Sequence, residues 1–88
     1  MGKYKIVITS SAEKALFKVP KQILPKILSC INGLSFDPFP RGYKKIKGHD
    51  NTFRLRVQNY RIIYELQSDV LTITVLKVGH RKDIYRNL

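Results

Sequence analysis

The chain has 88 residues, enough for one small domain with a single modest hydrophobic core, so residues 1–88 are taken as one domain. Its 17 Lys and Arg residues against 6 Asp and Glu residues give a formal net charge of +11, which favours a polyanionic partner such as RNA, DNA or an acidic protein. Neither a long apolar run nor a basic amphipathic helix is present, which disfavours a membrane partner. The first residues lack a signal-peptide pattern, so we expect a cytoplasmic protein.

Cysteine and histidine are too few to build a metal site in this sequence. The chain has one cysteine, Cys30, and two histidines, which excludes an intrachain disulfide and gives no metal-ligand cluster. Cys30 falls within an apolar helical pattern, where a single thiol is usually a small core residue. We therefore expect neither a metal nor another cofactor.

The first third of the chain predicts a strand followed by two helices. Residues 3–9 (KYKIVIT) alternate polar and apolar side chains, as in a half-buried strand. The pattern Ser10-x-x-Glu13 resembles a capping box and predicts that a short helix begins at Ser10. Apolar residues at three- and four-residue spacing over 23–34 predict a second helix. This helix either begins late enough to hold Pro25 in its first turn or is kinked there.

Residues 52–66 (TFRLRVQNYRIIYEL) predict a β-hairpin. Apolar residues alternate with arginines over 53–57, and a second run rich in aromatic and β-branched residues follows the pair Gln58-Asn59. A two-residue turn, in which Asn59 tolerates a positive φ, would fix the register of the two strands. The apolar pairs would then be Val57 with Tyr60, Leu55 with Ile62, and Phe53 with Tyr64.

In the same register, the other side of the hairpin carries arginines. Arg56 would lie directly opposite Arg61, with Arg54 two residues along. Like charges opposed across two strands are destabilising, so the cluster indicates a bound anion. The alternative is a solvated arginine face, which is common on antiparallel sheets.

The segments around the hairpin complete the predicted fold. Residues 37–51 (DPFPRGYKKIKGHDN) predict a loop whose lysines form either a solvated charge run or part of a binding surface. A last strand is predicted over 70–78, after a turn at Ser68-Asp69 and before Gly79. Its apolar face would include Leu71, Ile73 and Val75. The order β-α-α-β-β-β gives an α+β domain, with two N-terminal helices packed on one face of a mainly antiparallel sheet.

The helices need to bury their apolar stripes, so they would cover the apolar face and leave the arginine face open. Arg81 and Tyr85 follow the last strand, which neighbours the hairpin, and can reach the same open surface.

Three segments in order, KKIKG, FRLRVQNYRIIYEL and KVGHRKDIYR, resemble the RelE/ParE toxin superfamily, and more closely its RelE branch of ribosome-dependent mRNA interferases. The similarity covers nearly the whole chain and is strongest over 44–86. Toxins of this branch enter the ribosomal A site and cut the mRNA codon without a metal, by attack of the mRNA's own 2′-OH on the adjacent phosphate. The resemblance implies mRNA on the 70S ribosome and a small cognate antitoxin as partners.

The resemblance also implies roles for individual residues. Arg54 and Arg56 match two basic residues that alternate on the family's second strand, and Arg61 matches the arginine of a tyrosine-arginine pair on the next strand. Arg81 matches the arginine after a Gly-x step, and Tyr85 matches a tyrosine that stacks on a codon base. The basic residues beside this set are implied in RNA or ribosome binding: Lys44, Lys45, Lys47, Lys82 and Arg86.

One departure from the family concerns proton transfer. The best-known RelE sites have lysines where this chain has Arg54 and Arg56, and arginine does not readily give up its proton. His80 is the candidate substitute for the general base, because histidine suits proton transfer near neutral pH. The alternative is that His80 is a polar residue at the end of a strand.

Two other functions remain open. The ParE branch keeps the fold but inhibits DNA gyrase without nuclease activity, and a non-catalytic nucleic-acid-binding module would also fit the charge. The combination of Arg61, Arg81 and Tyr85 favours the endoribonuclease over the gyrase inhibitor.

Overall fold

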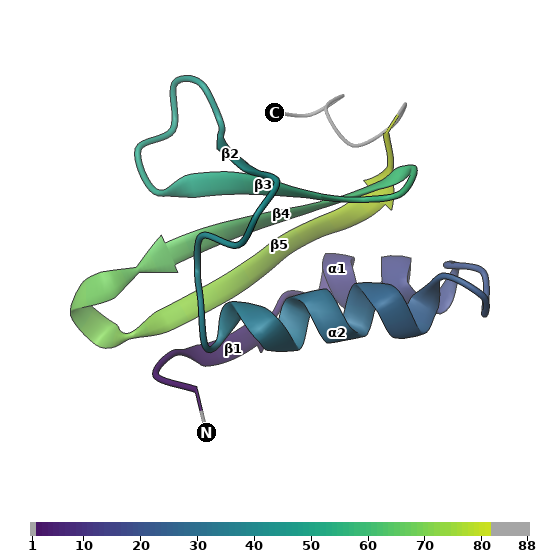
Figure 1. Cartoon of the computed structure of the whole chain (residues 1–88), viewed down its shortest axis with the longest axis horizontal. Helices are drawn as coiled ribbons and strands as arrows, with labels where there is room; N and C mark the ends of the chain where they lie inside the picture. Colours follow the sequence, from purple (N-terminus) through teal and green to yellow (C-terminus); the bar gives the residue numbers. More distant parts are fainter. Residues whose placement is uncertain (1, 82–88) are drawn as a thin grey trace.

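A five-stranded sheet carries both helices on one of its faces (Figure 1). The computed structural model describes residues 2–81. The elements, in chain order, are β1 (Lys5–Ile8), α1 (Ser10–Phe17), α2 (Leu24–Leu34), β2 (Tyr43–Lys45), β3 (Thr52–Val57), β4 (Tyr60–Gln67), the 3₁₀ turn η1 (Ser68–Val70) and β5 (Thr72–His80). The predicted α+β architecture, with two helices on one face of a mainly antiparallel sheet, is confirmed.

The strand order is β1-β5-β4-β3-β2, so β4 lies in the middle of the sheet. β1 pairs with β5 in parallel, and the other neighbours pair antiparallel. β2 was not predicted: it lies within the expected loop over 37–51 and pairs with the outer edge of β3. All three of its residues are exposed, so no apolar alternation marked it in the sequence.

Both predicted helices form, and α1 begins at Ser10 as predicted, although its N-cap residue differs from the one expected. The N-cap of α1 is Thr9, whose Oγ1 accepts a hydrogen bond from the backbone N–H of Ala12 at 3.1 Å, so the cap lies one residue before the predicted Ser10. α2 begins at Leu24 and holds Pro25 in its first turn, where the missing N–H would have no helical partner. The first of the two alternatives for Pro25 is therefore correct.

The core lies between the helices and the sheet. Its largest fully buried members on the sheet are Ile62, Tyr64, Ile73 and Val75, and α2 contributes Ile27 and Leu34. The predicted hairpin register is confirmed, because Leu55 pairs with Ile62 and Phe53 pairs with Tyr64. In the turn, Gln58 adopts the positive φ of 54° that was expected of Asn59.

The start and end of the last strand differ from the prediction. Leu71 does not face the core: it is exposed, has a φ of 48°, and ends the turn formed by η1. β5 begins at Thr72 and continues through Gly79 to His80.

A bulge in β5 changes which residues face the helices. Tyr64 pairs with Val75, but the preceding residue Ile63 pairs with Lys77, so Leu76 is an extra residue in β5. Before the bulge Ile73 and Val75 face the core, and after it the buried residue is Val78. The Thr9 hydroxyl donates a hydrogen bond to the Leu76 carbonyl at 3.0 Å, so the N-cap of α1 also holds the bulge.

Candidate nucleic-acid interface

The face of the sheet opposite the helices carries a row of basic side chains across four strands. Lys44 of β2 pairs with Arg54 of β3, Arg54 with Ile63 of β4, and Ile63 with Lys77 of β5. Directly paired residues share a face, and neighbouring strands lie about 4.8 Å apart. Three cationic side chains therefore lie in one line, with the fully buried Ile63 between Arg54 and Lys77.

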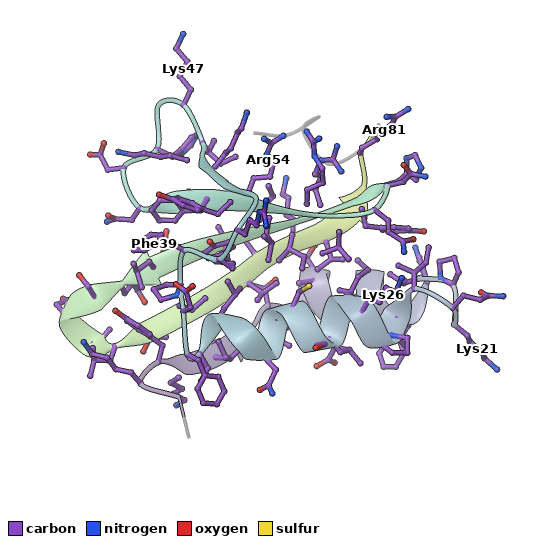
Figure 2. The ribbon with its side chains drawn as sticks, in the orientation of Figure 1. Lys21, Lys26, Phe39, Lys47, Arg54 and Arg81 are labelled. Atoms are coloured by element: carbon purple, nitrogen blue, oxygen red, sulfur yellow. The ribbon has the colours of Figure 1, made fainter. Side chains whose placement is uncertain are left out.

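A second row lies beside the first, toward the hairpin turn. Arg56 pairs with Arg61, as predicted, and Arg61 pairs with Gly79. Arg81 follows at the end of β5, where its backbone N–H donates a hydrogen bond to the Asn59 carbonyl at 2.8 Å. Figure 2 shows Arg54 and Arg81 extending on the side of the sheet away from the helices.

Arg61 differs from the other arginines because its side chain is only 6% exposed. Its Nη1 donates hydrogen bonds to the carbonyl oxygens of Gln58 at 3.2 Å and of Tyr60 at 3.1 Å. Hydrogen bonds of this kind offset part of the cost of burying a charged group. In this structure Arg61 stabilises the hairpin turn, and its contact with a phosphate remains a prediction.

His80 lies on the other face of the sheet from the arginines. The bulge at Leu76 turns His80 toward the helices, where its ring packs edge-on against Tyr60 with centroids 5.7 Å apart and an interplanar angle of 77°. Together with Lys18 and Val19 it lines a pocket of about 250 Å³. The structure therefore does not bring His80 together with Arg54, Arg56 and Arg81.

The structure places the other basic residues predicted from the sequence at different positions, and not all of them lie on the cationic face opposite the helices. Lys44 belongs to the basic row, whereas Lys45 pairs with the core residue Phe53 and so lies on the other face of β2. Lys47 lies in the loop between β2 and β3 and extends away from the sheet (Figure 2). Lys82, Tyr85 and Arg86 lie outside the described residues.

Sequence reasoning missed Lys77. Simple alternation along β5 continues the apolar series Leu71, Ile73 and Val75 to position 77, which would place Lys77 toward the core. Only the bulge places it with Arg54, and the sequence has no glycine or proline at Leu76 to mark the irregularity.

Among the side chains of residues 2–81, two have clearly shifted pKa values, and both belong to the scaffold. Burial raises the pKa of the Tyr64 hydroxyl, with Asp37 and Tyr43 acting in the same direction, and this hydroxyl donates a hydrogen bond to the Pro38 carbonyl at 2.6 Å. Burial also raises the pKa of the Cys30 thiol, which makes it a poor nucleophile.

Within residues 2–81, neither α1 nor α2 has the length and apolar character needed to cross a bilayer. No group of three or more His, Cys, Asp and Glu side chains in this part of the chain is placed to hold a metal ion.

A helix-covered core on one face and a cationic surface on the other define a small α+β domain that fits a polyanion. Residues 6–85 match the family model described as the ParE toxin of the type II toxin–antitoxin system parDE. The chain is 33% identical over 84 residues to toxin RelG of Mycobacterium tuberculosis, covering 94% of this chain and 97% of the relative. It is 39% identical over 85 residues to toxin RelE3 of Methanocaldococcus jannaschii, covering 92% and 94%.

Among solved structures, the archaeal RelE–RelB complex from Pyrococcus horikoshii contains a chain that superposes with a TM-score of 0.81 at 28% identity, covering 92% of this chain and 98% of that chain. The protein belongs to the RelE/ParE family and is a RelE-type toxin of a type II toxin–antitoxin system.

Proposed function

We propose that this toxin is a ribosome-dependent endoribonuclease that cuts mRNA in the ribosomal A site, by attack of the mRNA 2′-OH on the adjacent phosphate and without a metal. The observation that carries the proposal is the cationic face: Lys44, Arg54 and Lys77 in one row, with Arg56 and Arg81 beside it. The similarity to toxins named RelE and RelG supports the same assignment.

The chemistry requires charge stabilisation that arginine supplies well. Attack of the 2′-OH on the phosphodiester creates a five-coordinate phosphorus with additional negative charge on its oxygens, and a guanidinium can hold two of them at once. The bond from phosphorus to the 5′ oxygen of the next nucleotide then breaks, which leaves a 2′,3′-cyclic phosphate and, after the leaving oxygen takes up a proton, a 5′-hydroxyl. Arg54 and Arg56 lie on one face of β3 two residues apart, about 7 Å along the strand, so both can reach one phosphodiester or two neighbouring ones. Preorganised donors of this kind typically contribute about 100-fold or more each to the rate.

Proton transfer needs a different group. Because an arginine side chain does not readily give up its proton, we assign Arg54, Arg56 and Arg81 to binding and charge stabilisation rather than to general base catalysis. Because His80 lies on the helix side of the sheet, we leave it out of the proposed catalytic set. Tyr85 is proposed to stack on a codon base, as the family resemblance implies.

We also propose that a small cognate antitoxin covers part of the cationic face. The similar toxins from Pyrococcus horikoshii and Methanococcus jannaschii were solved in complexes with RelB. An antitoxin with acidic side chains would neutralise the opposed Arg56 and Arg61 and keep mRNA away from them. Because translating ribosomes are the proposed target, we place the protein in the cytoplasm.

The test is primer extension on mRNA incubated with programmed ribosomes and purified toxin. Wild-type protein should cut within the A-site codon, and free mRNA should be cut weakly. Arg54→Ala should lower the single-turnover rate by about 100-fold, because it removes one preorganised donor from the phosphate site. Lys14→Ala is the matched control, since it removes one exposed positive charge from α1 on the helix side.

The second candidate is inhibition of DNA gyrase, which the match to the ParE model favours. Intact mRNA on translating ribosomes together with blocked supercoiling would support that function and contradict the nuclease. Near-normal cleavage by Arg54→Ala would contradict the assignment of the cationic face as the cleavage site.

A further inference from the structure

Two aromatic rings are exposed at the outer edge of the sheet, in the segment that joins α2 to β3. Phe39 and Tyr43 are 42% and 41% exposed, and their ring centroids lie 5.1 Å apart with an interplanar angle of 47°. Figure 2 labels Phe39 on this segment. Unlike a single exposed side chain, two exposed aromatic rings in contact form a continuous apolar surface, which is a candidate contact for a ligand.

The aromatic pair of Phe39 and Tyr43 packs on a third ring, that of the buried residue Phe53. Phe53 packs edge-on against both rings, with centroids 5.2 Å from Phe39 and 6.0 Å from Tyr43, and Phe53 in turn packs on the buried Tyr64. The Tyr64 hydroxyl donates to the Pro38 carbonyl at 2.6 Å, which fixes the segment to the middle of the sheet. Both rings are thus preorganised by the core.

Local hydrogen bonds restrict the backbone of the same segment. The Phe39 N–H donates to Asp37 Oδ1 at 3.0 Å, and the Tyr43 N–H donates to the Pro40 carbonyl at 3.0 Å. Gly42 has a φ of +95°, a conformation that other residues rarely adopt. A loop built in this way presents its side chains at a low entropic cost.

The side chains around the aromatic pair are cationic. Arg41 lies between the two aromatic residues in sequence, and Lys44 and Lys45 follow directly; all three are exposed. Lys45 lies on the same face of β2 as Tyr43, whereas Lys44 lies on the other face, in the row with Arg54. β2 therefore connects the aromatic pair to the cationic face around the edge of the sheet.

We propose that Phe39 and Tyr43 stack on an unpaired base of single-stranded RNA, with Arg41 and Lys45 binding the flanking phosphates. Aromatic rings beside cationic side chains are the usual means of binding single-stranded nucleic acid without base-pair readout. The inference rests on the proposed function only in taking RNA as the ligand. The base belongs either to the mRNA or to an unpaired loop of ribosomal RNA, and both present the same chemistry.

The experiment compares three variants of the full chain that keep the net charge. Tyr43→Leu removes a ring from the pair and Tyr43→Phe keeps it. Phe17→Leu removes an exposed ring from α1, where Phe17 is 82% exposed beside Lys18. Two probes are titrated at one fixed salt concentration: a fluorescein-labelled single-stranded oligouridylate and vacant 70S ribosomes. Thermal unfolding followed by circular dichroism establishes that each variant is folded.

We expect Tyr43→Leu to weaken binding about tenfold, the effect of losing one base–aromatic stack, while Tyr43→Phe and Phe17→Leu bind as wild type does. Weakening with the oligonucleotide alone assigns the base to mRNA, and weakening with the vacant ribosomes, which carry no mRNA, assigns it to ribosomal RNA; both results support the inference. Unchanged affinity of Tyr43→Leu for both probes, or an equal loss with Phe17→Leu, would overturn it.

Two further measurements distinguish RNA binding at the aromatic pair from protein binding and from cleavage. If Tyr43→Leu loses affinity for the antitoxin but not for either RNA probe, the aromatic pair is a protein-binding surface and the inference is wrong. Cleavage by the wild-type protein is measured independently by primer extension. If the wild-type protein does not cleave mRNA, the proposed nuclease activity is wrong, but the RNA-binding result for Tyr43 is unaffected.

Discussion

Side chains on both faces of β4 are buried, but only those on the helix side belong to the hydrophobic core. On the helix side, Ile62 and Tyr64 belong to the hydrophobic core. On the other side, Arg61 and Ile63 are also buried, yet the core formed by the described residues does not include Ile63. The neighbouring strands carry cations that are exposed, as with Arg56 of β3, or half-buried, as with Lys77 of β5. The cationic face is therefore a buried central strip with half-buried or exposed cations on both sides, rather than a uniformly solvated surface.

The largest expected difference between the faces is in stability. Ile62→Ala should lower the free energy of unfolding by about 2–5 kcal/mol, because it leaves a cavity in the core. Arg56→Ala, on the exposed part of the other face, should change it by no more than about 0.5 kcal/mol. Urea unfolding of the two variants measures both values. Equal destabilisation would mean that the arginine face is as structural as the core.

Arg61 tests whether the central strip of the cationic face is structural. Arg61→Ala removes the hydrogen bonds to the Gln58 and Tyr60 carbonyls, and we expect a loss of about 1.5–3 kcal/mol of stability. Cleavage by the folded variant should also fall, by about 100-fold if Arg61 reaches the phosphate as well. Arg61→Lys should recover only part of either loss, because a lysine cannot form the same fork. A large fall in cleavage with unchanged urea unfolding would show that Arg61 acts on the substrate alone.

Thr9 tests the connection between the helices and the cationic face. Thr9→Val keeps the shape of the side chain but removes both the N-cap of α1 and the hydrogen bond to Leu76, and should cost about 1–2 kcal/mol. Because the bulge sets the direction of Lys77 and Arg81, cleavage should fall by more than the folded fraction does. Thr9→Ser retains the hydroxyl and is the control. Cleavage proportional to the folded fraction in Thr9→Val would show that the bulge persists without Thr9.

Tyr64 gives a smaller effect with a defined pH dependence. Tyr64→Phe loses the hydrogen bond to Pro38 and should cost about 1 kcal/mol near neutral pH. Since burial raises the pKa of Tyr64, the folded state favours the protonated hydroxyl. Its contribution to stability is complete below the ordinary tyrosine pKa of about 10 and is lost as the pH rises above it. The unfolding temperature at alkaline pH should therefore fall more steeply for wild type than for Tyr64→Phe, and parallel curves would contradict this.

His80 should give the smallest change in catalysis. Because its ring packs against Tyr60 on the helix side, we expect His80→Ala to keep the shape of the pH–rate profile between about pH 5 and 9. Single-turnover cleavage on programmed ribosomes provides the measurement. Loss of the acidic limb in His80→Ala would restore His80 as the general base and would require the end of β5 to rearrange on the ribosome.

Much of the fold could be predicted because its signals are local. The two-residue turn and the alternation in 53–57 fixed the register that opposes Arg56 and Arg61, and Pro25 marked the first turn of α2. β2 could not be predicted, because a three-residue edge strand has no buried face and its pairing with β3 is its main determinant. The aromatic pair could not be predicted either. The sequence FPRGYKK contains both residues, but the packing of Phe39 and Tyr43 on Phe53 is a tertiary contact.

The sequence by itself determined the fold class, the family resemblance and the arginines of β3 and β4, because these depend on composition, short-range periodicity and one tight turn. Only the tertiary structure decided which residues of β5 join them. Leu76 is an extra residue in β5, and its carbonyl accepts a hydrogen bond from the hydroxyl of Thr9, far away in the sequence. The bulge at Leu76 turns Lys77 toward the arginines and His80 toward the helices, and no local pattern in β5 carries this information.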